Sequence, residues 1–177
     1  MTGLGATIVG SLLMAGVSTL GDFIWATWLP QHRAVYGLTH GTLLFCAIGL
    51  FLGTLAARPA AGAAAGALIG ALAASAFYVL APAVGYSAMF VVWVGVWMAF
   101  GLLYARLSGT RINAVGAMHA PPLRRGAIAA VASGLAFYMI SGIWRPFDPT
   151  GLDYVVHFGA WTLAYFPGFA ALLLARR

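Results

Sequence analysis

Six apolar stretches, each about long enough to cross a membrane, occupy most of this chain and constrain its fold more than any other feature. A hydrocarbon core of about 30 Å needs a helix of about 20 apolar residues. The candidates are residues 4–29, 35–56, 59–80, 86–107, 125–144 and 152–175. The 177 residues include only nine arginines and three aspartates, with no lysine or glutamate, which is too little charge for a soluble domain.

The backbone of these stretches must satisfy its own hydrogen bonds, because hydrocarbon offers no partners. The stretches lack the polar–apolar alternation of a membrane barrel. The sequence therefore predicts an all-α, polytopic membrane protein, a six-transmembrane-helix bundle that forms one domain over residues 1–177. The first stretch lacks a basic leader and is too long for a signal peptide, so we expect a retained helix. The Pro121-Pro122 pair in the longest connection, 108–124, indicates an exposed loop.

The arginines are unevenly distributed between the two ends of the predicted bundle. With six helices both termini lie on one side, which carries Arg58, Arg106, Arg111, Arg124, Arg125, Arg176 and Arg177. The other side carries only Arg33 and Arg145. The positive-inside rule then places both termini in the cytoplasm. Many alanines and arginines without lysine are typical of GC-rich bacteria, so we expect the protein to lie in a bacterial inner membrane. The arginines form no basic patch, so we expect no nucleic-acid partner.

Gly62, Gly66 and Gly70 recur at every fourth position of the third stretch and form one smooth ridge. Such a ridge lets a neighbouring backbone approach closely in a membrane. It predicts helix packing, within the chain or between chains, rather than the wall of a ligand site.

Asp22 lies about two turns inside the end of the first stretch, where an ionised carboxylate costs about 2.5 to 3.5 kcal/mol. It therefore needs a partner or must be neutral. The short turn to the second stretch makes the two helices neighbours, so His40 or Arg33 is the predicted partner. Two interpretations stay open: a hydrogen bond that locks helix packing, or a polar rim that orients the head group of a ligand.

Aromatic side chains line one face of the fourth stretch and one face of the last, at helical spacing. Asp153, near the start of the last stretch, has with Thr150 the spacing of a capping box. The two faces pack against each other or line an apolar cavity with a few polar handles. They consist of Trp93, Trp97, Phe100 and Tyr104, and of Tyr154, His157, Trp161 and Tyr165.

His40 and His157 both begin helices on the same side, which leaves haem ligation by two histidines as an alternative. The sequence contains no nucleophile motif, metal-binding spacing or phosphate-binding loop, so we expect no enzyme, no metal and no cofactor. The lone Cys46 offers no disulfide. A small transporter lacks support, because the sequence shows no inverted repeat.

Four segments resemble stretches of the Insig family in the same order. They are DFIWAT (Asp22–Thr27), GTLLFCAIGLFLG (Gly41–Gly53), GVWMAF (Gly95–Phe100) and FYMISGIW (Phe137–Trp144). The resemblance implies a six-helix bundle with a lipid-binding cavity and, as in bacterial relatives, a bound membrane lipid and a homotrimer. Eukaryotic Insigs respond to oxysterols and hold the escort protein Scap. Here Gly101 replaces the acidic residue that engages Scap, so this partner is not expected and the protein partner stays unknown.

The third stretch offers only Ser75 and Tyr78 where eukaryotic Insigs carry polar residues that help recognise sterol. A polar group buried without a partner costs about 1 to 3 kcal/mol, so a diacylglycerol-like lipid is expected before a sterol. We expect a lipid-binding or lipid-sensing protein, with acyl chains between the aromatic faces of the fourth to sixth helices. The alternatives are a structural or assembly protein without ligand and a b-type haem protein. The expected lipid-binding residues are Asp22, Trp25, His40, Thr42, Trp93, Trp97, Phe137, Tyr138, Ser141, Trp144, His157 and Trp161.

Overall fold

The computed structural model describes residues 3–28, 33–109, 121–141 and 151–174, and within these ranges it contains helices and no strand. The fold is therefore all-α, as predicted. The α-helices are α1 (Gly3–Trp28), α2 (Arg33–Leu55), α3 (Pro59–Val84), α4 (Ala88–Leu107), α5 (Pro121–Ser141) and α6 (Gly151–Leu173). A short 3-10 turn, η1 (Gly85–Ser87), joins α3 to α4.

Five of these helices, all except α5, are long and apolar enough to cross a membrane. The protein is thus a multi-pass integral membrane protein. Arg124 and Arg125, the fourth and fifth residues of α5, lower the hydropathy of that helix. The predicted end of the fifth span, residues 142–144, lies outside the described residues.

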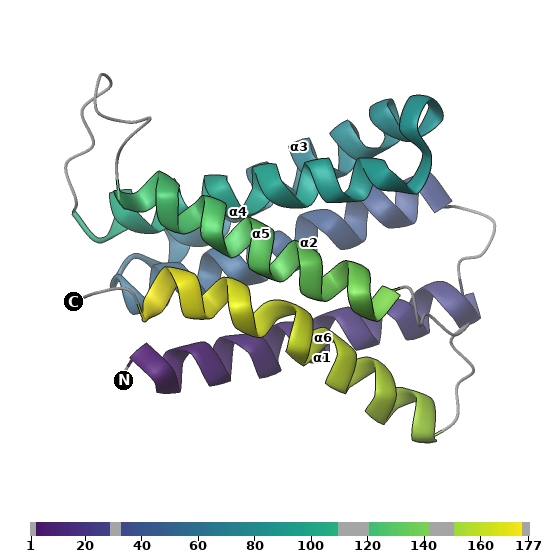
Figure 1. The fold of residues 1–177 in the computed structure, drawn as a ribbon, viewed down its shortest axis with the longest axis horizontal. Helices are drawn as coiled ribbons and strands as arrows, with labels where there is room; N and C mark the ends of the chain where they lie inside the picture. Colours follow the sequence, from purple (N-terminus) through teal and green to yellow (C-terminus); the bar gives the residue numbers. More distant parts are fainter. Residues whose placement is uncertain (1–2, 29–32, 110–120, 142–150, 175–177) are drawn as a thin grey trace.

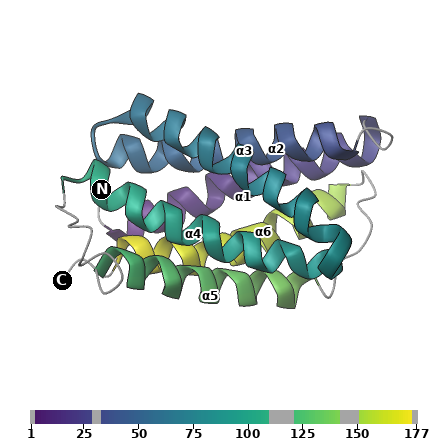
Figure 2. The ribbon, with the colours of Figure 1, turned by 90° about the horizontal axis from the view of Figure 1, so that it is seen from above.

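The helices run along the long axis of the molecule, and α1 begins at the end where α6 finishes (Figure 1). Seen from above, α2 and α3 lie side by side at one edge of the bundle and α5 lies at the opposite edge (Figure 2). Contacts run from α2 through α3, α4, α5 and α6 to α1. The ring closes weakly, because α1 contacts α2 far less than it contacts α6. The first helix of the chain therefore packs chiefly against the last.

Two helix boundaries differ from the predicted ones by four residues, and both involve proline. The Pro121-Pro122 pair begins α5 instead of lying in a loop, because the first turn of a helix does not need the N–H that proline lacks. α3 continues past residue 80 through Pro82 to Val84. It ends at Gly85, whose positive φ of 62° suits glycine and whose N–H bonds to the Ala81 carbonyl.

The glycine ridge of α3 packs against α2, so the predicted packing role is confirmed, and it is used within the chain. A Cβ added to Gly62 would lie closer than 3.0 Å to the backbone of Gly49 and Gly53. A Cβ added to Gly66 would similarly overlap the Phe45 carbonyl and the Gly49 backbone. Backbone meets backbone along this seam, and a side chain on the ridge would force α2 and α3 apart.

Candidate functional site

Asp22 of α1 is bound by two side chains of α6. Its Oδ2 atom accepts a hydrogen bond from Nε1 of Trp161 at 2.7 Å and lies 2.9 Å from Nδ1 of His157. His157 and Trp161 are one helical turn apart, so both extend from one face of α6. The His157 side chain is 5% exposed and the Asp22 side chain is 18% exposed. A polar contact inside two membrane-spanning segments therefore joins the first helix to the last.

The predicted pairing of Asp22 with His40 is wrong. The His40 ring instead stacks on Tyr36, with ring centroids 5.4 Å apart and an interplanar angle of 6°, and it packs on Gly21. The Tyr36 hydroxyl donates to the Gly21 carbonyl. The side chain of Arg33, the other predicted partner, lies outside the described residues. Proximity in sequence did not predict the partner, because α1 packs along α6 rather than along α2.

The aromatic faces of α4 and α6 pack directly against each other. The ring centroids of Trp93 and Tyr165 lie 5.8 Å apart, and those of Trp97 and Phe169 lie 5.6 Å apart. Trp97 is 1% exposed, and Tyr165 and Phe169 are 0% exposed. Gly168 allows this approach, because a Cβ there would overlap the Trp97 ring. The expectation that acyl chains lie between these faces is therefore wrong, since the rings fill that space themselves.

Buried hydrogen bonds that were not predicted from the sequence connect α6 to α5 and α1, and α5 to α4. Nε1 of Trp93 donates to the Ser133 hydroxyl at 3.1 Å, and that hydroxyl donates to the Ala164 carbonyl at 2.6 Å. These two bonds link α4 to α5 and α5 to α6. The hydroxyls of Ser18 and Tyr165 lie 2.9 Å apart and link α1 to α6.

The sequence did carry one signal for the polar contacts of α1. Thr7, Ser11, Ser18 and Asp22 follow one another at spacings of four and seven residues, so they share one helical face. The first three are 0% exposed. A polar stripe on an otherwise apolar helix indicates the side that another helix covers.

Replacing Ser133 by alanine is expected to lower the free energy of unfolding by about 1 to 3 kcal/mol, because Nε1 of Trp93 stays buried without its acceptor. Unfolding in mixed micelles of SDS and a mild detergent measures the change. The control is Ser75→Ala, since the exposed Ser75 hydroxyl donates to the Ala71 carbonyl of its own helix. This control should change stability by less than about 0.5 kcal/mol. Equal effects of the two substitutions would contradict a role for the buried bonds.

The remaining predicted lipid-binding residues are placed as follows. Thr42 lies on α2, and its hydroxyl donates to the Leu38 carbonyl of the same helix at 2.7 Å. The structure thus joins three of the predicted residues, Asp22, His157 and Trp161, and packs His40 against Gly21, the residue before Asp22. Outside the described residues lie the side chains of Trp25, Phe137, Tyr138 and Ser141 and the whole of Trp144.

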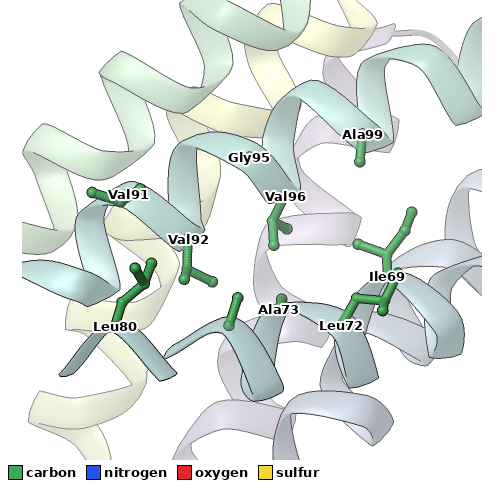
Figure 3. Close-up of a pocket in the computed structure, with 10 residues that line it drawn as sticks. Ile69, Leu72, Ala73, Leu80, Val91, Val92, Gly95, Val96 and Ala99 are labelled. Atoms are coloured by element: carbon green, nitrogen blue, oxygen red, sulfur yellow. The ribbon is translucent and has the colours of Figure 1, made fainter. Parts of the chain in front are cut away.

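A groove of about 340 Å³ lies between α3 and α4 (Figure 3). Its largest lining side chains are Ile69, Leu72 and Leu80 of α3 and Val91, Val92 and Val96 of α4. Gly95 also lines the groove, and a Cβ added there would meet no atom within 4 Å. The groove was not predicted from the sequence, because small residues on two helices leave a gap only if those helices face each other.

Within the described ranges, no group of three or more His, Cys, Asp or Glu residues is placed to hold a metal ion. Comparisons with protein-family models, with curated proteins and with solved structures find no match. The residues and geometry of this chain therefore have to carry the functional proposal.

Proposed function

We propose that this integral membrane protein binds a membrane lipid, with one acyl chain of the lipid in the α3–α4 groove. The observation that carries the proposal is an apolar recess formed by two helices that are both long and apolar enough to cross the membrane. The groove therefore opens in a hydrocarbon environment. Its volume of about 340 Å³ falls within the range of about 300 to 1,000 Å³ for ligand sites.

The walls of the groove favour an acyl chain over a sterol. Every lining residue is Ala, Gly, Val, Leu or Ile. Close packing rather than exclusion from water favours association in hydrocarbon, and a flexible methylene chain finds such contacts along the walls. The hydroxyl of a sterol would find no side-chain partner there, at a cost of about 1 to 3 kcal/mol. A diacylglycerol-like lipid is therefore the first candidate.

The ordered Insig-like segments support a non-enzymatic lipid sensor or lipid-binding protein over a purely structural one. A structural or assembly role would use the glycine ridge of α3 between chains, whereas α2 occupies that ridge within the chain. A homotrimer in a bacterial inner membrane, with cytoplasmic termini, belongs to the same proposal.

Replacing Gly95 by leucine is expected to lower the lipid content of the purified protein about tenfold, which corresponds to about 1.4 kcal/mol. The new side chain enters the open groove without meeting neighbouring atoms at its Cβ. Native mass spectrometry of the protein in mild detergent measures bound lipid per chain. The matched control is Gly159→Leu on α6, where an added Cβ also meets nothing within 4 Å. Equal lipid content in wild type and both variants would contradict binding in the groove.

A further inference from the structure

The carboxylate of Asp22 has hydrogen-bonding capacity that the described residues do not use. Both contacts from α6 reach the same atom, Oδ2, and within the described part of the chain Oδ1 makes no hydrogen bond. The side chain is 18% exposed, so a ligand has access to it. Oγ1 of Thr19, one turn earlier on α1, is also buried without a partner among the described residues. A buried polar atom without a partner is rare in proteins and calls for an explanation.

Aromatic residues of two further helices contact Asp22 or Gly21, the residue before it. Trp161 of α6 donates to the Asp22 carboxylate and stacks on Tyr165, with ring centroids 5.7 Å apart. On the α2 side, the stacked rings of Tyr36 and His40 contact Gly21, the residue before Asp22. The Trp161 N–H lies in the plane of its ring, so the edge of this ring meets Oδ2 and leaves Oδ1 unoccupied by the described residues.

The charge of an ionised Asp22 determines which ligand charge this position favours. Among the described residues, the one ion pair found for Asp22 is with His157, which is charged only when protonated. An ammonium group has N–H donors for the unused oxygen and carries the charge opposite to that of a carboxylate. The carboxylate would repel a phosphate group.

We propose that the unused oxygen of Asp22, beside Trp161 of α6, forms a binding site for an ammonium group. The group comes either from a free amine or from the head group of an amine lipid. This site lies between α1 and α6, whereas the acyl groove lies between α3 and α4, so neither proposal depends on the other.

The test titrates the 177-residue chain in detergent with free ethanolamine and, separately, with phosphatidylethanolamine or phosphatidylglycerol of identical acyl chains. Native mass spectrometry counts the adducts. A lipid source of the amine predicts a preference of at least about tenfold for phosphatidylethanolamine over phosphatidylglycerol. A free-amine source predicts that ethanolamine binds on its own. Failure of ethanolamine to bind, together with equal affinities for the two lipids, would overturn the proposal.

Asp22→Asn removes the charge with little change of shape and is expected to lower amine affinity at least about tenfold. Gly95→Leu should leave amine affinity unchanged, and Asp22→Asn should leave the binding of uncharged diacylglycerol unchanged. The ammonium site and the acyl groove can therefore be confirmed or contradicted separately. If Asp22→Asn does not fold, Trp161→Leu serves instead, because it keeps the carboxylate and removes the N–H that holds its Oδ2 in place. Unaltered amine affinity in the folded variant would contradict the site.

Discussion

Replacing Gly66 by leucine is expected to lower the stability of the protein by about 3 kcal/mol or more. The first carbon of the new side chain would overlap the Phe45 carbonyl and the backbone of Gly49. Backbone cannot move aside as the end of a flexible side chain can, so α2 and α3 must separate along their seam. Since folded proteins are stable by only about 5 to 15 kcal/mol, much of the protein is expected to misfold or to aggregate on extraction.

The amount of monodisperse protein after size exclusion and the thermal midpoint in detergent measure this effect. The control is Gly95→Leu, the same substitution at a helical glycine with open space around it. A Gly66→Leu protein with the yield and midpoint of the control would show that α2 and α3 do not approach as closely as described.

Trp97→Ala is expected to destabilise the protein by about 3 to 5 kcal/mol, because it leaves a large void among packed rings. Trp97 is 1% exposed and contacts Phe100 and Phe169 ring to ring. If Trp97 instead lined a lipid cavity, its truncation would change lipid content before stability. The substitution therefore separates a core residue from a ligand contact.

Unfolding in mixed micelles measures the loss for Trp97→Ala, and native mass spectrometry of the remaining folded protein measures its lipid content. Leu163→Ala on α6 is the control, because Leu163 is 64% exposed and its truncation leaves no internal void. A stable Trp97→Ala protein that has lost its lipid would contradict the packed core and would support a lipid cavity between α4 and α6.

The helices themselves were predictable, because hydrocarbon imposes one local requirement on every apolar stretch. The glycine ridge was predictable for a similar reason: a regular spacing on one helix defines a face without any knowledge of the neighbour. The proline boundaries were less certain, since Pro121 is equally compatible with a loop and with the first turn of a helix.

The partner of Asp22 was not predictable from the sequence alone. His40 was the natural candidate because α2 follows α1, but contact with His157 depends on α6 packing along α1. That long-range arrangement has no local signature. The direct packing of the aromatic faces was missed for a related reason, since the spacing of Trp93 and Trp97 is the same in a filled core as in a cavity wall.

Lipid binding is the central claim, and a native mass spectrum of the wild-type protein, extracted in mild detergent without added lipid, tests it most directly. The expected result is a population in which each chain carries one diacyl lipid, lost when Gly95 is replaced by leucine. A spectrum of ligand-free protein, or one with a haem-sized adduct, would contradict the claim.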